Sequence, residues 1–549
     1  MAYDYQSSAF GLCALMANDT SFDLHGILGR LQNRREFLQL FGKGLGYSAL
    51  ATVLPACGGS SSGSSDEPLP PQTIVIPKAS PEYTALKRTS FGPHRDELAS
   101  IKTLGITNYL EQQLNPVDEP ALEAEIASSF PLTLKSPAEL IQDFPDNIFD
   151  VATQMIAATQ YRQMFSQRQL FEIMVEFWSD HFNIHLVNGL GPTLKPDDDQ
   201  QVIREHALGN FRDLLHASAK SSAMLFYLDN FINQAGPDGA NENYARELME
   251  LHTLGVDGGY TEFDVKEVAR CFTGWTLRFP GDPGGNYGEF VYVDAIHDNQ
   301  AKLVLGNTIA MGGGQADGEQ VLDILFSHPS TANFIATKLC RRFISDTPSQ
   351  AAVDAVAAAF TNSNGEIKDT LRALFATADF LGDADQKFTR PSEYLATLVR
   401  SLAPDTGYPP DKGTTWFYAQ NTLGQIPFYW PTPDGYPDQQ SYWASTGGLL
   451  NRWRLSFLSF AGIIPGVDVI DVDYTTMLNG ANTLETVVDT ITDAVLMRPL
   501  SSDDRSTIVE WLKGELGVTE QELLPATVPE QASALVAAVL VSSVYFHLR

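Results

Sequence analysis

One short stretch holds an unusual density of groups that could do acid–base chemistry. Residues 241–252 read Asn-Glu-Asn-Tyr-Ala-Arg-Glu-Leu-Met-Glu-Leu-His, with three acids, an arginine and a histidine on one expected helix. Arg246 lies four residues after Glu242 and four before Glu250, so it can pair in both directions. Glu247 lies on another face. If this helix is solvated, its charges are ordinary; if it is buried, its carboxylates need partners, protons or a metal.

Histidines in three other segments could act as metal ligands. His181 and His185 are four residues apart, and on a helix this spacing places both on one face, which suits two ligands of one ion. His206 and His297 are further candidates. The alternative places His181 in the core and His185 near a helix end, where its charge interacts favourably with the helix dipole. Without further helical ligands the HxxxH pattern is weak, so this alternative is preferred.

Two hypotheses follow from these residues. In the first, the chain is an enzyme in which residues from separate segments converge, hold a divalent metal ion or act as general acid and base. Its metal ligands would be His181, His206 and His297, and its catalytic group would be Glu242, Arg246, Glu247, Asp229 and Asp298. In the second, the chain is a non-enzymatic surface protein whose polar motifs form buried salt bridges and whose aromatic loop 416–443 binds a glycan or a protein.

Helices must position these residues. Apolar residues recur at three- and four-residue spacing over most of the chain, predicting helices over 97–114, 138–144, 150–182, 203–229, 243–254, 261–275, 319–326, 330–343, 350–360 and 367–380. Asn241 is a good N-cap, and Thr261-Glu-Phe-Asp264 resembles a capping box. The fold class is therefore mainly α: one large domain over 81–549, with a small β-hairpin near 290–305 and a long loop rich in Pro, Gly and aromatic residues near 403–445.

The hairpin prediction is specific. Residues 290–293 would pair with residues 302–305, which places His297 and Asp298 at the turn. The long loop has two interpretations, a functional lid or a structural aromatic plug over the helices.

The N-terminus predicts export and lipid anchoring. The pair Arg34-Arg35, followed by Phe-Leu, resembles a twin-arginine export signal. A mildly apolar stretch then leads to Leu-Pro-Ala-Cys57, which resembles a lipobox in which the cysteine is acylated. Residues 1–57 are therefore expected to be a lipoprotein signal and residues 58–80 a flexible tether. The expected location is the cell envelope, with the chain anchored to a membrane and facing the periplasm or the surface.

Composition argues against one partner class. The 549 residues are 44% hydrophobic and 19% charged, which is a globular composition, with a formal net charge of −31. A charge of that sign argues against a nucleic-acid backbone as partner, because phosphate binding needs a basic stripe. Two of the four cysteines, Cys271 and Cys340, lie in the expected domain. They could pair in an oxidising compartment or remain buried thiols.

Several motifs in order resemble a known family. Phe177-Trp-Ser-Asp-His-Phe182, the stretch 241–251, Phe272-Thr-Gly-Trp275 and Pro431-Thr-Pro-Asp-Gly435 are similar to the bacterial family catalogued as domain of unknown function 1800, from about residue 83 onward. The resemblance implies export, and a co-encoded exported protein of sulfatase or phosphatase fold as a partner. It implies no activity.

The chain departs from the family pattern at two positions. His252 stands where phenylalanine is expected, and Ser179 where histidine is common. We therefore expect His252 to be inessential to any shared chemistry. His185 also lies outside the family pattern, which weakens the HxxxH hypothesis further.

Overall fold

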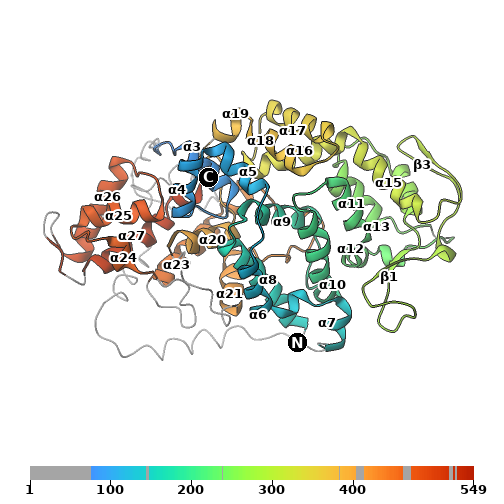
Figure 1. Cartoon of the computed structure of the whole chain (residues 1–549), viewed down its shortest axis with the longest axis horizontal. Helices are drawn as coiled ribbons and strands as arrows, with labels where there is room; N and C mark the ends of the chain where they lie inside the picture. Colours follow the sequence, from blue (N-terminus) through green and yellow to red (C-terminus); the bar gives the residue numbers. More distant parts are fainter. Residues whose placement is uncertain are drawn as a thin grey trace, which may run out of the picture.

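Helices dominate the computed structural model of the chain. It describes residues 76–143, 148–237, 239–382, 384–402, 413–460, 472–518, 523–525 and 528–549. The predictions for Arg34, Arg35 and Cys57 fall outside these residues. The described part contains 26 α-helices and two small two-stranded sheets (Figure 1). The mainly α prediction is confirmed.

The helices follow one another with short connections. The first group is α3 (Pro81–Thr89), α4 (Arg95–Leu104), α5 (Ile106–Leu114), α6 (Pro120–Ser129), α7 (Pro137–Asp143), α8 (Ile148–Phe165), α9 (Gln169–His181) and α10 (Gly191–Asp198). The second is α11 (Phe211–Lys220), α12 (Ser222–Tyr227), α13 (Asn243–Glu247), α14 (Glu262–Cys271), α15 (Ala316–Ser327), α16 (Pro329–Phe343), α17 (Gln350–Asn362), α18 (Ile367–Phe375) and α19 (Ala378–Gly382). The third is α20 (Pro391–Leu402), α21 (Gly413–Leu423), α22 (Gln440–Trp443), α23 (Thr446–Phe460), α24 (Tyr474–Leu478), α25 (Leu484–Val495), α26 (Ser502–Leu516), α27 (Val528–Val541) and α28 (Val544–His547).

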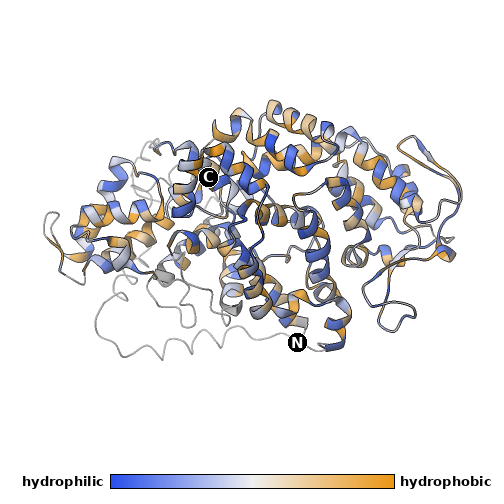
Figure 2. Cartoon of the chain, viewed as in Figure 1, coloured by the Kyte–Doolittle hydropathy of each residue, from blue (hydrophilic) through white to orange (hydrophobic). Residues whose placement is uncertain are grey.

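The apolar faces of these helices meet in a shared core. Hydrophobic and hydrophilic residues divide between opposite sides of many helices (Figure 2), as expected for helices that bury one stripe. One continuous cluster of buried apolar side chains runs from Ala79 to Phe546. Helices α16, α17 and α18 pack in sequence, and α23 and α25 pack on α27. The two sheets lie at the end of the molecule opposite α24–α27 (Figure 1).

The predicted pairing of the β-hairpin is wrong. Strand β2 (Phe290–Tyr292) pairs with β1 (Trp275–Leu277), and β3 (Lys302–Val304) pairs with β4 (Asn307–Ile309), both antiparallel. Leu305 and Gly306 both have positive φ, 48° and 77°, as a two-residue hairpin turn of type I′ requires. The chain therefore reverses immediately after β3, and β3 pairs with the strand that directly follows it.

Two helix predictions also need correction. Helix α9 ends at His181, so His185 lies beyond the helix and the two histidines do not share a helical face. The segment predicted as one helix over 243–254 is a short α13 followed by a π-helical segment, η6 (Leu248–Thr253). Glu242 is its N-cap residue, although the Asn241 side chain does accept a hydrogen bond from the Asn243 N–H.

The long loop is shorter than predicted. Helices α21 and α22 occupy parts of 403–445, and 424–439 connects them. The predicted capping box of Thr261 and Asp264 is present at the start of α14. Cys271 and Cys340 are free, buried thiols, so the disulfide alternative does not hold in this structure.

Candidate active site

A charged cavity of about 270 Å³ lies between the C-terminal end of α9, helix α16 and the segment 434–439. Its lining includes four cations and three carboxylates, namely Lys338, Arg341, Arg342, Arg390, Asp180, Asp434 and Asp438. The whole chain carries 67 acidic and 36 basic residues. Cations therefore outnumber carboxylates in the cavity lining, whereas acidic residues outnumber basic residues in the whole chain.

The segment 434–439 is fixed against α9 by close backbone contact. Gly435 has φ +73°, and a Cβ there would lie 2.0 Å from the carbonyl oxygen of Asp180, so only glycine fits. The Asn183 side chain donates hydrogen bonds to the carbonyls of Trp430 (3.0 Å) and Thr432 (2.7 Å). The Tyr436 hydroxyl donates to the Ile426 carbonyl at 2.8 Å. This wall of the cavity is therefore held in one position by residues on both of its sides.

A buried ion-pair network supports the cavity. Glu393 contacts Arg342 (2.6 Å), Arg549 (3.1 Å) and Arg390 (3.7 Å), and all four side chains are at most 3% exposed. Arg390 also pairs with Glu176. Burial opposes the charge of Glu393, but Arg342, Arg549 and Arg390 outweigh it and lower its pKa to about 2. The network locks α9, α16 and the start of α20 together.

Asp180 faces the cavity with unused hydrogen-bonding capacity. Its Oδ2 accepts a hydrogen bond from Arg390 at 2.8 Å, while its Oδ1 has no hydrogen-bond partner among the described residues. Burial raises the pKa of Asp180 to about 6, although Arg390 opposes the shift. A carboxyl group with this pKa can accept a proton near neutral pH.

Lys338 faces the same cavity and is held by a histidine. Its ammonium donates a hydrogen bond to His181 Nδ1 at 2.9 Å, and His181 Nε2 lies 3.1 Å from the His252 carbonyl oxygen. This arrangement assigns the His181 proton to Nε2. Burial first, and Lys338 second, lower the pKa of His181 well below its usual value. Burial also lowers the pKa of Lys338 to about 8.

The residues predicted in 241–252 form a half-exposed cluster. Arg246 pairs with Glu242 (3.1 Å) and with Glu262 (2.7 Å) of the next helix. The predicted ion pair of Arg246 with Glu250 is absent from the described contacts. Burial and the Glu250 charge raise the pKa of Glu247. A smaller contribution comes from Asp434. The ion pair of Arg246 with Glu262 joins α13 to α14.

The two predicted aspartates have structural partners. Asp229 is exposed and adopts a left-handed conformation, φ 57°, and its Oδ2 accepts a hydrogen bond from Asn243 at 3.3 Å. Asp298 pairs with Arg270 at 2.7 Å. Burial opposes the charge of Asp298, but the hydrogen bond from Arg270 lowers its pKa below the usual value.

The three predicted metal ligands lie in separate surroundings. His181 is enclosed by aromatic rings, including those of Phe182 and Phe211. His206 is half-buried after the π-helical segment Asp199–Arg204. His297 is buried, with Nδ1 2.7 Å from the Thr273 carbonyl and Nε2 3.2 Å from Asp317. No group of three or more His, Cys, Asp or Glu side chains placed to hold a metal occurs in the described part of the chain.

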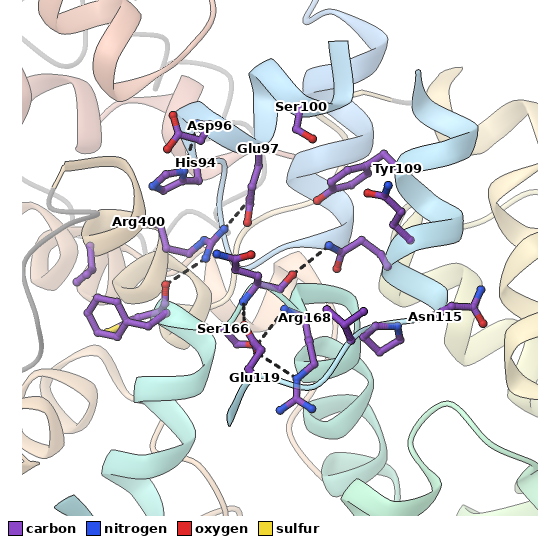
Figure 3. A pocket seen from close by; sticks show the side chains of 18 residues that line it. His94, Asp96, Glu97, Ser100, Tyr109, Asn115, Glu119, Ser166, Arg168 and Arg400 are labelled. Atoms are coloured by element: carbon purple, nitrogen blue, oxygen red, sulfur yellow. Dashed lines mark hydrogen bonds and ion pairs between the residues drawn. The ribbon is translucent and has the colours of Figure 1, made fainter. Parts of the chain in front are cut away.

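A second, larger cavity of about 680 Å³ lies among α4, α5 and the chain before α9 (Figure 3). Its main charges are paired within it. Arg400 contacts Glu97 at 2.6 Å, and Arg168 contacts Glu119 at 3.0 Å. Because these pairs satisfy one another, this cavity offers less for a reacting group than the first one.

The sequence interpretation missed the cations of the first cavity. The apolar spacing of residues 330–343 predicts a helix, and Lys338, Arg341 and Arg342 also place three cations within five residues of an acidic chain. That local reversal of charge is the signal that could have found them. Asp180 occurs in the sequence analysis only within the motif 177–182, with no role assigned to it.

The family comparison covers both walls of the first cavity. The family described as protein of unknown function (DUF1800) matches residues 84–547. The chain belongs to this family. In this DUF1800 chain, the motif 177–182 supplies Asp180 and His181, and the motif 431–435 supplies Asp434 and Gly435.

No curated protein and no solved structure matches the chain. Across the residues with described positions, no helix is both long and apolar enough to cross a bilayer.

Proposed function

We propose that this chain is an exported, lipid-anchored enzyme that hydrolyses extracellular material by acid–base catalysis in the cavity of Asp180 and Lys338. Export and anchoring rest on the Arg34-Arg35 pair and on Cys57 in its lipobox-like context. The expected exported partner of sulfatase or phosphatase fold belongs to the same proposal. No step requires a metal ion.

One observation carries the catalytic part. Asp180 and Lys338 line the same cavity, yet each is held by a different partner, Arg390 for the carboxylate and His181 for the ammonium. Among the described residues, no carboxylate lies within 4 Å of the Lys338 ammonium. Asp180 can therefore accept a proton and Lys338 can donate one within the same cavity, because the two groups do not form an ion pair with each other.

The reaction can be written for a substrate with a cleavable carbon–oxygen bond. Asp180 accepts a proton from a water molecule as that water bonds to the substrate carbon. Lys338 donates a proton to the leaving oxygen as its bond to carbon breaks. Each turnover consumes one water and leaves two hydroxyl-bearing or acid products, and the two side chains then exchange protons with solvent. His181 is a positioning residue, since it acts through the Lys338 ammonium.

The test compares Asp180→Asn and Lys338→Met with Arg246→Gln, a control outside the cavity. The wild-type chain and the three variants are assayed on a panel of chromogenic esters and glycosides. We expect turnover that the first two substitutions reduce at least 100-fold and the control leaves unchanged. Turnover that survives both cavity substitutions would refute the assignment.

A second measurement needs no substrate. The pKa of Lys338 can be followed by NMR after ¹³C-methylation of the lysines, with Lys338→Met to assign the signal. We expect titration near 8. A normal lysine pKa together with no turnover on the panel would favour the alternative of a non-enzymatic surface protein, for which the buried Glu393 ion-pair network is the supporting feature.

Anchoring is tested separately. In a host with both export and lipoprotein pathways, we expect Cys57→Ala to abolish incorporation of a labelled fatty acid. Substitution of both Arg34 and Arg35 by lysine should leave the precursor in the cytoplasm. Labelling that persists in Cys57→Ala would refute the lipid anchor.

A further inference from the structure

The cavity holds two cations that no carboxylate of the described chain neutralises. Lys338 donates its hydrogen bond to His181, and Arg341 makes one long hydrogen bond, 3.4 Å, to the Asp346 carbonyl. Within the described residues neither side chain has an Asp or Glu oxygen within 4 Å. Both line the cavity, so they can offer several N–H donors to a ligand.

Two of the three carboxylates that line the same cavity are paired with cations other than Lys338 and Arg341. Asp180 accepts from Arg390 at 2.8 Å. Asp438 contacts Lys387 at 2.8 Å. Asp434 accepts hydrogen bonds from neutral groups, the Trp430 indole at 2.9 Å and the Thr432 hydroxyl at 2.5 Å, so it keeps its charge. Two unpaired cations therefore face one unpaired carboxylate, and this excess of positive charge favours an anionic group on the ligand.

Aromatic rings form an edge-to-face cluster beside the cavity, called the platform below, in which the planes of Trp430 and Tyr442 are inclined at 79°. The ring of Trp430 lies 5.1 Å from that of Tyr436 and 5.7 Å from that of Tyr442, and Tyr442 lies 4.7 Å from Trp443. Tyr436 lines the cavity itself, and the side chain of Tyr442 is 48% exposed. The platform therefore continues from the cavity wall to the surface. Flat aromatic faces bind the C–H faces of sugar rings, and adjacent carboxylate and amide groups accept their hydroxyl hydrogens.

We propose that the cavity binds one acidic sugar unit of a saccharide chain, with its carboxylate or sulfate paired with Arg341 and with one N–H of Lys338, whose remaining N–H is kept for the leaving oxygen, and the neighbouring units on the Trp430–Tyr442 platform. Acidic saccharides would then be the substrate class of the proposed enzyme, and this part of the inference rests on the proposed function. The cavity of about 270 Å³ is just below the roughly 300 Å³ at which sites for drug-sized ligands begin. It suits one charged unit, and the open platform suits the rest of the chain.

The experiment measures binding to the folded chain by calorimetry. The probes are a uronic-acid tetrasaccharide, its methyl ester, inorganic sulfate and a short polyglutamate peptide. We expect the tetrasaccharide to bind at least tenfold more tightly than its ester, because esterification removes the charge and keeps the sugar faces. Equal affinity for acid and ester would overturn the proposal. Binding of polyglutamate as tight as that of the tetrasaccharide would overturn the saccharide part, and sulfate as effective as the tetrasaccharide would overturn the role of the platform.

Two variants separate the contacts. Arg341→Gln should weaken the binding of the acid tetrasaccharide at least tenfold and leave the binding of the ester unchanged. Tyr442→Ala should weaken the binding of both. Arg246→Gln is the control, with unchanged affinity. Arg341 is half-buried and makes one long hydrogen bond, so thermal melting can check that its replacement leaves the fold intact. Unchanged affinity in a folded Arg341→Gln variant would overturn the anion site.

The outcome distinguishes this inference from the proposed function. If the acidic tetrasaccharide binds as described but no acidic saccharide is hydrolysed, the binding site stands and the enzymatic proposal fails. If Asp180-dependent turnover is found on a neutral substrate that the acidic tetrasaccharide does not inhibit, the enzymatic proposal stands and the inference fails.

Discussion

Two charged regions of this chain differ in where their charges lie and in what satisfies them. In the cluster of Glu242, Arg246 and Glu262, the side chains are 34%, 34% and 70% exposed, and Arg246 contacts both acids. In the network beneath the cavity, Arg390 and Glu393 are 2% and 3% exposed. Lys338 and Arg341, which line the cavity above it, have no carboxylate partner among the described residues. Exposed pairs are weak because water screens them, whereas buried charges are strongly coupled to fold and ligand. A high density of charged residues in the sequence therefore does not identify the region whose side chains could take part in a reaction.

The largest difference is expected in catalysis. Asp180→Asn should reduce kcat/KM by about 10²–10⁴-fold, because it removes the general base. The matched change in the exposed cluster, Glu242→Gln, should leave kcat/KM unchanged. Rates measured from pH 4 to 10 should rise as Asp180 loses its proton near pH 6 and fall as Lys338 loses its proton near pH 8. A flat profile, or equal losses in both variants, would contradict the comparison.

The second largest difference between the two regions is expected in the free energy of unfolding. Glu393→Gln leaves three buried arginines without their shared carboxylate and should lower the free energy of unfolding by about 3–5 kcal/mol. The pKa of Glu393 is depressed to about 2. Its contribution is therefore present above its ordinary value near 4.5 and is lost as pH falls through about 2. Urea unfolding at pH 7 and pH 3 measures both effects, and a loss below 1 kcal/mol at pH 7 would show that the network is not stabilising.

Gly435→Ala tests the contact that fixes the cavity wall. The new Cβ would lie 2.0 Å from the Asp180 carbonyl oxygen at a positive φ, so overpacking and strain together should cost about 2–5 kcal/mol. Gly424→Ala is the matched control. Its φ is +86° with nothing within 4 Å of the new Cβ, so only the backbone cost of about 1–2 kcal/mol is expected. Equal melting temperatures of the two variants would show that the segment 434–439 can shift to accommodate the added methyl group.

Lys338→Met should stabilise the chain while it abolishes activity. Burial lowers the pKa of Lys338 to about 8, so below that pH the folded chain keeps a charge that its surroundings disfavour. Between about pH 8 and 10.5 the folded chain binds fewer protons than the unfolded one, and its stability rises with pH. Removal of the amine should therefore gain about 0.5–2 kcal/mol at pH 7, typical when a functional group is removed. A lower melting temperature in Lys338→Met would identify Lys338 as a structural residue.

The smallest effect is expected at Arg246. Its ion pairs are half-exposed, so Arg246→Gln should change the free energy of unfolding by less than about 1 kcal/mol, and less again at high salt. Thermal melts at 0.05 M and 0.5 M salt measure this. If Arg246→Gln lowered the free energy of unfolding as much as Glu393→Gln does, the exposed cluster and the buried network would not differ in stability as proposed.

Local patterns predicted part of the fold well. The apolar spacing gave the mainly α class, and Thr261 with Asp264 gave the start of α14, because both signals act within a few residues. The predicted hairpin failed, since the turn at Leu305 and Gly306 directs β3 to β4. A left-handed leucine is not evident from residue type, because leucine rarely adopts that conformation.

The candidate site depended on contacts that no local pattern contains. Lys338 and His181 are 157 residues apart in sequence, and Arg390 and Asp180 are 210 apart. The motifs 177–182 and 431–435 contain Asp180 and Gly435, but nothing in the sequence shows that these two residues are in contact. The histidines and acids named from the sequence were those with notable neighbours along the chain, and most of them proved to have structural partners.

The sequence by itself determined the helical class, the family and the expectation of export, since these depend on periodicity, motif order and a short N-terminal pattern. The tertiary structure decided which charges are buried and which have partners. Burial arises when segments such as α9, α16 and 434–439 pack together, and it sets the free energy of each charge. For that reason Arg246 and Arg390, which each have a glutamate three or four residues away in the sequence, differ in exposure from 34% to 2%.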